Sequence, residues 1–203
     1  MSSEDAPVNE SFILASGSEI RKQILSDHGL NFIVQTSEID EEELKEKYKD
    51  LPFIERAKKL ALAKAEKISK ANPNKYVLGA DQMCVFNKIV LNKPGNEENA
   101  VNSLKLLSGD THYQYSGIAI CLNGESIWSF CDKATLTMRD LSDKEIRSYV
   151  NKDEPYQCAG SYKYESHGSD LFSEVKGSTY TIQGLALTAL LKAFEDLGLS
   201  FRK

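Results

Sequence analysis

The chain has 203 residues, of which 41% are hydrophobic and 27% charged, proportions typical of a globular protein with one substantial core. Its 25 Lys and Arg residues against 30 Asp and Glu residues give a net charge of −5, without a long basic run. This composition argues against a general nucleic-acid-binding protein, although a single nucleotide needs only a few local cations. No apolar stretch approaches the roughly 20 residues that span a bilayer, so we expect no membrane partner.

The N-terminal segment and the cysteines indicate where the protein resides. Residues 1–11 are polar and acidic, without the basic and apolar regions of a signal peptide, and we expect a disordered tail followed by a single domain over 12–203. No two cysteines form a CxxC pair, which indicates reduced thiols in a cytoplasmic protein. The cysteines are Cys84, Cys121, Cys131 and Cys158.

The first predicted elements are a buried strand over 12–15 and a helix that ends at Gly29. Between them, Ser18 is a suitable N-cap, and its hydroxyl and the first-turn amides form a place where an anion could bind. A plain strand–turn–helix with serine as the cap explains the same residues equally well.

The next elements are a strand over 31–36, an acidic helix start over 38–43 and a helix over 54–68 with apolar residues at helical spacing. Lys64 lies within this last helix, where a lysine is usually solvated. A strand over 76–81 follows, and we expect it to be the central strand of the sheet.

The end of this central strand, at Asp81, is the most informative position in the chain. A carboxylate at the end of a buried strand is costly to desolvate unless a cation or another partner meets it. Ligands bind at strand ends in open α/β sheets, so we expect the chemistry here. Arg21 and Lys22 lie upstream and Lys93 downstream, and an acid among spaced cations and hydroxyls suits a phosphate ester.

The second half of the chain continues the alternation of strands and helices and adds antiparallel hairpins. Asn123-Gly124 is the strongest of the hairpin signals. The pattern predicts a mixed sheet in an α/β protein. The predicted elements are a hairpin turning at Asn87-Lys88, a helix over 97–107, strands over 113–122 and 127–138, a helix capped by Ser142, a loop over 158–162 and a helix over 185–197.

Several common catalytic motifs are absent from the sequence. There is no GxxxxGK[ST] loop, no GxGxxG and no GxSxG elbow, which excludes P-loop, dinucleotide-binding and serine-hydrolase sites of those kinds. The three histidines do not have metal-ligand spacing. The remaining carboxylates, lysines, arginine and hydroxyls suit metal-assisted attack of water on a phosphate anhydride.

An ordered series of motifs resembles the Maf family of nucleoside triphosphate pyrophosphatases. Each motif is weak alone, but the series is specific and covers about residues 12–197. The motifs are Leu-Ala-Ser-Gly-Ser-Glu-Ile-Arg-Lys at 14–22, Glu-Ile-Asp-Glu at 38–41, Ala-Lys-Ala at 63–65, Gly-Ala-Asp-Gln at 79–82, Lys-Pro at 93–94, Leu-Ser-Gly at 107–109, Cys-Ala-Gly-Ser at 158–161 and Gln-Gly-Leu at 183–185.

The resemblance implies both a fold and a reaction. The fold is an elongated mixed β-sheet with flanking helices and two lobes around a nucleotide cleft, similar to the inosine triphosphate pyrophosphatases. The reaction cleaves between the α- and β-phosphates of a nucleoside triphosphate with a divalent cation, Mg²⁺ or Mn²⁺. The family also suggests a homodimer.

The resemblance further implies roles for individual residues. Asp81 falls on the proton acceptor of the family and Glu41 on its conserved acid, and both suit Mg²⁺, which prefers oxygen ligands. Whether Asp81 acts as base or as ligand stays open. The substrate-binding candidates are Ser18, Arg21, Lys22, Lys64 and Lys93.

Three positions separate the branches of the family by substrate, and here they are Ile20, Gln82 and Glu165. Gln82 and Glu165 resemble the branch that prefers 7-methyl-GTP, whereas the dTTP and UTP branch typically has Thr and Gln. Glu165 could accept hydrogen bonds from the guanine N1–H and amine, and its charge would favour the cationic methylated base.

One departure from the family pattern leaves alternatives open. Glu19 stands where the family usually has Pro, and it adds a negative charge beside the predicted phosphate site. This favours a second reading, a nucleotide-binding regulator of cell division without catalysis. A third reading is a pyrophosphatase directed at dTTP and UTP.

Overall fold

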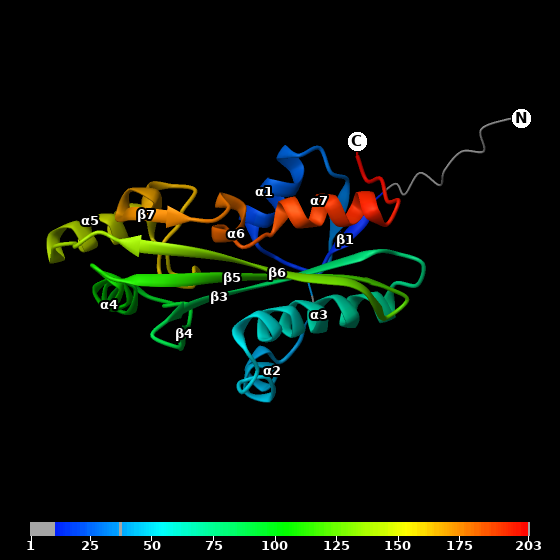
Figure 1. The fold of residues 1–203 in the computed structure, drawn as a ribbon, viewed down its shortest axis with the longest axis horizontal. Helices are drawn as coiled ribbons and strands as arrows, with labels where there is room; N and C mark the ends of the chain where they lie inside the picture. The colour runs from blue at the N-terminus through cyan, green and yellow to red at the C-terminus, as the bar shows by residue number, and fades with distance from the viewer. Residues whose placement is uncertain (1–10, 37, 203) are drawn as a thin grey trace, which may run out of the picture. The chain divides into compact units, whose positions relative to one another are not determined.

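The computed structural model describes residues 11–36 and 38–202 (Figure 1). Apart from Ser11, the tail expected over 1–11 lies outside the described residues. The strands are β1 Phe12–Leu14, β2 Phe32–Val34, β3 Val77–Phe86, β4 Ile89–Leu91, β5 Thr111–Leu122, β6 Glu125–Met138 and β7 Phe172–Lys176. The helices are α1 Glu19–Asp27, α2 Glu41–Lys47, α3 Phe53–Ala71, α4 Glu97–Leu107, α5 Asp143–Asp153, α6 Thr179–Ile182 and α7 Leu187–Asp196, with a 3₁₀ helix η1 His167–Leu171. None of these helices is long and apolar enough to cross a bilayer.

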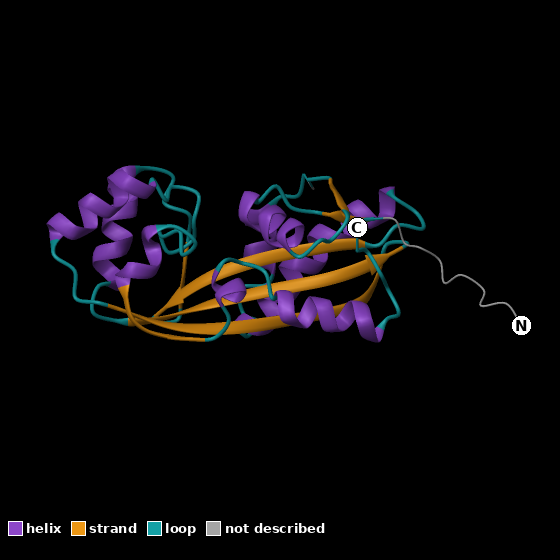
Figure 2. Cartoon of the chain, turned by 90° about the horizontal axis from the view of Figure 1, so that it is seen from above, coloured by secondary structure: helices purple, strands orange, loops and turns teal. Residues whose placement is uncertain are grey.

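The strands form one seven-stranded sheet in the order β2-β1-β3-β5-β6-β7, with β4 paired to β3. β1 is parallel to β2 and to β3, whereas β3–β4 and β6–β7 are antiparallel pairs. Figure 2 shows the long strands in orange and the helices in purple. The predicted mixed sheet of an α/β protein with flanking helices is therefore confirmed.

The chain divides into two compact units. The first comprises the described residues within 1–81, 117–131 and 186–203, and the second comprises 82–116 and 132–185. β3, β5 and β6 each contribute residues to both units. The single domain over 12–203 stays a prediction.

In the first unit, α3 packs unusually close to the sheet because two strands present glycines to it. A Cβ at Gly79 of β3 would lie 2.1 Å from the Ala61 carbonyl oxygen, and one at Gly117 of β5 would lie 2.2 Å from that of Ala57. Only glycine leaves room for this approach. Figure 1 shows α3 running along these strands. The contact fixes α3, and with it Lys64, against the face of β3 that carries Gly79 and Asp81.

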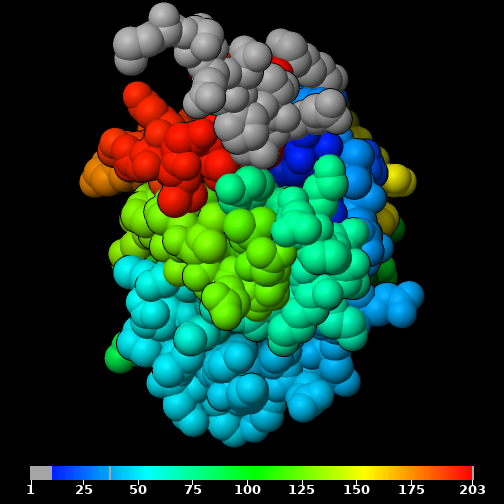
Figure 3. Space-filling model, turned by 90° about the vertical axis from the view of Figure 1, so that its right-hand side faces the viewer, coloured from blue at the N-terminus to red at the C-terminus, as the bar shows by residue number. Residues whose placement is uncertain are grey.

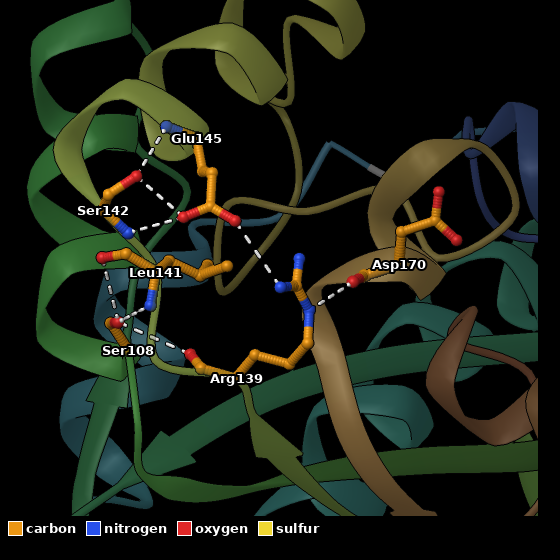
Figure 4. A network of polar contacts seen from close by, with 6 residues as sticks. All are labelled: Ser108, Arg139, Leu141, Ser142, Glu145 and Asp170. Atoms are coloured by element: carbon orange, nitrogen blue, oxygen red, sulfur yellow. Dashed lines mark hydrogen bonds and ion pairs between the residues drawn. The ribbon is translucent and has the colours of Figure 1, made fainter.

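In the second unit, hydrogen bonds join the start of α5 to neighbouring segments (Figure 4). Ser142 and Glu145 form a capping box that satisfies the first amides of α5. Arg139 donates to Glu145 at 3.5 Å and through Nε to the Asp170 carbonyl at 2.9 Å, and the Ser108 hydroxyl accepts from Leu141 N at 2.7 Å. The predicted Ser142 cap is confirmed, and these bonds connect the ends of α4, β6 and η1.

The sequence prediction was wrong about where the central strand ends. β3 continues through Asp81 to Phe86, so this carboxylate lies in the middle of a strand. An acid is tolerated there because Lys64 reaches it from α3, a contact that local sequence does not reveal. β7, η1 and α6 were not predicted either, since they are short and depend on packing against β6 and β3.

His112 and Gln114 of β5 form a buried polar cluster with Tyr162, and all three residues are at most 4% exposed. Gln114 Nε2 donates to the Tyr162 hydroxyl at 2.7 Å, and this hydroxyl lies 2.9 Å from His112 Nε2. The tyrosine accepts from Gln114 and can donate its own proton to Nε2 of a neutral imidazole. Burial lowers the pKa of His112 to about 4.

We predict that His112 makes stability fall in mild acid. Its folded pKa lies below its ordinary value, so its contribution is complete above pH 6.5 and is lost as the pH falls towards 4. Urea unfolding at pH 7 and pH 5 should show a drop in the free energy of unfolding that is about 2 kcal/mol larger in the wild type than in His112→Gln. His28→Gln is the control, and its free energy of unfolding should fall between pH 7 and pH 5 by as much as that of the wild type. An equal drop in wild type and His112→Gln would contradict the prediction.

Candidate active site

Lys64 joins two carboxylates that come from different elements of the first unit. Its Nζ lies 2.7 Å from Asp81 Oδ1 and 3.0 Å from Glu41 Oε1. The side chains of Lys64 and Asp81 are 13% and 12% exposed, whereas that of Glu41 is 49% exposed. A largely buried ammonium shared between two carboxylates is a concentrated charge arrangement of the kind found in functional sites.

Each of these residues is held by local structure. Lys64 lies on α3, which the contacts at Gly79 and Gly117 press against the sheet. Glu41 is the first residue of α2, whose N-cap is Asp40. An acid in the first helical turn is favoured by the helix dipole. The sequence reading of an acidic helix start is therefore confirmed, and one of its acids also belongs to the site.

Arg21, in the first turn of α1, lies close enough to Asp81 and Glu41 for their charges to act on it. Arg21 Nη1 donates to Ser16 Oγ at 3.0 Å, and Ser18, the N-cap, accepts from the Arg21 backbone amide at 3.4 Å. Burial lowers the pKa of Arg21, and the charges of Asp81 and Glu41 partly offset this effect. The guanidinium therefore interacts electrostatically with both carboxylates. It stays cationic, as arginine does in proteins.

Ser16 is a site residue that the sequence analysis did not select. It is buried, and besides Arg21 it accepts from the Ser18 backbone amide at 3.3 Å. The available signal was its place directly after the buried run of β1, where a polar side chain needs a partner.

Lys22 is not brought to Lys64 and Asp81. It forms an ion pair with Glu19 one turn away on α1, and the Glu19 side chain is 88% exposed. Glu19 therefore points to solvent and neutralises Lys22 instead of opposing Arg21. Ile20, between them, is partly buried in the first turn of α1.

The other predicted site residues belong to the second unit. Lys93 and Glu165 are exposed, and the charges of both influence Cys158. The pKa of Cys158 is raised to about 11, mainly by burial and further by the negative charge of Glu165, whereas the positive charge of Lys93 lowers it. Gln82 donates through Nε2 to the Ile182 carbonyl at 2.6 Å, which ties β3 to the end of α6. The structure thus places Lys93 and Glu165 around one loop and gives Gln82 a separate partner.

The residues at Lys64 fit a divalent cation. Asp81 and Glu41 converge on one position that already holds a positive charge. No cluster of three or more His, Cys, Asp or Glu ligands occurs within residues 11–36 and 38–202. Mg²⁺ in nucleotide sites is commonly bound by one or two carboxylates together with substrate phosphates and water, so two carboxylates suffice.

Comparison with known proteins identifies relatives along nearly the whole chain. Residues 11–197 match the family described as Maf-like protein. A protein of Legionella pneumophila named nucleoside triphosphate pyrophosphatase is 41% identical over 91% of this chain and 92% of its own length. A Bacillus cereus protein named dTTP/UTP pyrophosphatase is 35% identical over 92% of this chain and 95% of its own. Among solved structures, a HAM1 protein from Coxiella burnetii covers 92% of this chain and 98% of its own, with 12% identity and a TM-score of 0.49.

We predict that Lys64→Met destabilises the fold by about 3 kcal/mol, because it leaves the largely buried Asp81 carboxylate without its ammonium. Lys64→Met/Asp81→Leu should recover most of this loss, since neither buried charge remains. Urea unfolding measures both. Lys58→Met is the matched control, because Lys58 lies on the same helix and forms a more exposed pair with Glu55 at 3.0 Å. A loss at Lys64 no larger than at Lys58 would contradict the prediction.

Proposed function

The chain belongs to the Maf-like protein family and is an enzyme of the nucleoside triphosphate pyrophosphatase class, and we propose that its preferred substrate is 7-methyl-GTP. Water attacks the α-phosphorus, the bond to the α–β bridging oxygen breaks, and 7-methyl-GMP and pyrophosphate leave. The reaction is hydrolysis of an acid anhydride.

The observation that supports triphosphate hydrolysis at this site is the pairing of Lys64 with both Asp81 and Glu41, with Arg21 under the influence of the same carboxylates. A triphosphate brings several negative charges, and Lys64 and Arg21 supply two cations for them. Neutralising charge that grows on the leaving pyrophosphate is the larger part of phosphoryl-transfer catalysis.

The two carboxylates have separate roles in the proposal. Asp81 is held in the middle of a rigid strand, and we assign it the proton of the attacking water. Glu41 and Asp81 would hold a divalent cation, Mg²⁺ or Mn²⁺. When bound, such a cation supplies charge neutralisation at the phosphate oxygens. Lys64 then has the phosphates as an alternative partner to the carboxylates.

The preference for 7-methyl-GTP rests on Gln82 and Glu165. Glu165 is exposed, so its carboxylate is available to the N1–H and amine of guanine, and its charge favours a cationic base. Gln82 is fixed by the Ile182 carbonyl and stabilises the adjacent α6. Lys93, near the same loop as Glu165, is proposed to bind phosphate.

A pyrimidine substrate is the second candidate. The observation in its favour is the 35% identical Bacillus cereus protein, which is named dTTP/UTP pyrophosphatase. That branch typically has Thr and Gln where this chain has Gln82 and Glu165, and this difference favours 7-methyl-GTP.

We predict that Asp81→Asn lowers kcat by about 10²- to 10⁴-fold, because the amide cannot accept the proton of water. Pyrophosphate release with Mg²⁺ measures the rate, and circular dichroism checks that the variant is folded. Asp196→Asn, an exposed change on α7, is the control and should keep full activity. A folded Asp81→Asn variant with wild-type kcat would show that another residue accepts the proton. A wild type that is inactive with both Mg²⁺ and Mn²⁺ would favour the nucleotide-binding regulator.

We also predict selective release of pyrophosphate from 7-methyl-GTP in a panel with GTP, dTTP, UTP and CTP. Gln82→Thr/Glu165→Gln should reduce kcat/KM for 7-methyl-GTP by about tenfold or more relative to dTTP, since one lost hydrogen bond to a charged group is worth at least this factor. If the wild type releases pyrophosphate chiefly from dTTP or UTP, the pyrophosphatase activity is supported and the assignment of 7-methyl-GTP as the preferred substrate is contradicted.

A further inference from the structure

Residues 163–168 of the second unit form a tight turn that carries Glu165, and we name it the Glu165 turn. The amides of Ser166 and Gly168 both donate to the Lys163 carbonyl, at 3.1 and 3.0 Å. A Cβ at Gly168 would lie 2.4 Å from this carbonyl oxygen, so only glycine leaves room for the turn. Tyr164 packs against the core of the unit, whereas Glu165 is exposed. The turn therefore presents the Glu165 carboxylate to solvent.

Both ends of the Glu165 turn are bound to one helix, α5. The Tyr149 hydroxyl accepts from the Lys163 amide at 2.8 Å. Asp153 accepts from the Ser166 hydroxyl at 3.0 Å and from the His167 amide at 3.0 Å. Tyr149 and Asp153 are four residues apart, so they lie on the same face of α5. This face of the helix thus holds the backbone of the turn both before and after its exposed residue.

The two α5 side chains form a buried pair. Tyr149 is 6% exposed and Asp153 is 5% exposed. Burial raises the pKa of Tyr149, and the charge of Asp153 and a hydrogen bond to it raise this pKa further. The hydroxyl therefore keeps its proton and donates it to Asp153 while it accepts from the Lys163 amide. Because every buried polar group of the pair has a partner, the arrangement is rigid.

The helix that carries this pair is itself fixed. At its start, Arg139 joins Glu145 of the capping box to the Asp170 carbonyl of η1 (Figure 4). Along its length, Ile146 and Val150 are buried in the core of the second unit. A side chain that is supported by a packed helix is held more precisely than one that depends on a loop alone. α5 can therefore determine where the Glu165 turn lies.

We propose that Tyr149 and Asp153 are positioning residues that set the base preference of the enzyme by fixing Glu165. This inference rests on the proposed function, in which Glu165 accepts from the N1–H and amine of guanine. A carboxylate that is already in place loses less conformational freedom when the base binds. The pairing edge of thymine or uracil presents a single N–H between two carbonyl groups, so a fixed carboxylate disfavours it.

The first experiment compares kcat/KM for 7-methyl-GTP and dTTP in Tyr149→Phe and Asp153→Asn. Each variant should lower the ratio of the two values about fivefold, because each removes at least one hydrogen bond to the turn. The loss should appear as a higher KM for 7-methyl-GTP with little change in kcat. Asp143→Asn is the matched control, since Asp143 begins the same helix but pairs with Lys105 of α4 at 2.7 Å. A wild-type ratio in both variants would overturn the proposal.

The same substitutions in a Glu165→Gln background separate positioning from a general loss of structure. The ratio should not fall further there, because the carboxylate that Tyr149 and Asp153 position is gone. An equal fall in both backgrounds would overturn the proposal. If Glu165→Gln alone leaves the ratio at the wild-type value, the proposed substrate preference fails together with this inference. If Glu165→Gln lowers the ratio and the two α5 variants do not, only this inference fails.

Hydrogen exchange without nucleotide tests the hold of α5 on the turn directly. Tyr149→Phe should speed exchange of the Lys163 amide, and Asp153→Asn that of the His167 amide, each by about fivefold or more. Asp196→Asn should change neither rate, because it lies on α7 of the first unit, in the C-terminal segment that Figure 3 shows in red. Wild-type exchange of both amides in the α5 variants would overturn the proposal.

Discussion

The close contact between α3 and the sheet is the constraint on which the site depends. Gly79 and Gly117 let the helix backbone come so near that a methyl group at either position would overlap a carbonyl oxygen of α3. Because Lys64 follows Ala61 by about one helical turn and Asp81 follows Gly79 on the same strand face, the contact that packs the core also sets the distance between the two charges. The apolar core and the polar site are therefore positioned by one interface.

The charges at this place are balanced without substrate. Lys64 pairs with Asp81 and Glu41, and the charges of the same carboxylates act on Arg21, so in the proposed function the carboxylates neutralise the cations to which a triphosphate would bind. In the proposed reaction, a nucleotide that arrives with a divalent cation would bring both signs of charge, and each protein group would exchange its partner for one on the substrate. Such an exchange would keep the cost of desolvating the Lys64–Asp81 pair small in both states.

The loop that carries Glu165 is held by a buried acid outside the candidate active site. Asp153, at the end of α5, accepts from Ser166 Oγ at 3.0 Å and from the His167 amide at 3.0 Å, and lies 2.7 Å from His167 Nδ1. Burial raises the pKa of Asp153, but these hydrogen bonds outweigh it and lower the pKa overall. The carboxylate thus stays ionised and ties the start of η1 to α5, which limits the conformations open to Glu165.

The sequence alone determined the elements with strong local signals. The α4 boundaries, the Ser18 and Ser142 caps and the hairpin turns at Asn87-Lys88 and Asn123-Gly124 follow from residue chemistry within a few positions, and the structure has them as predicted. The ordered motifs likewise indicated the family from the sequence, because each motif is a short run of adjacent residues.

Only the tertiary structure decided which charges meet. Lys64 has the appearance of an ordinary solvated lysine on a helix, and Asp81 that of a strand end, until α3 and β3 are packed together. Lys22 seemed equivalent to Arg21 in sequence, yet the helical turn directs it to Glu19 and solvent. Ion pairs between distant segments depend on where the chain folds back, and local propensity carries no information about that.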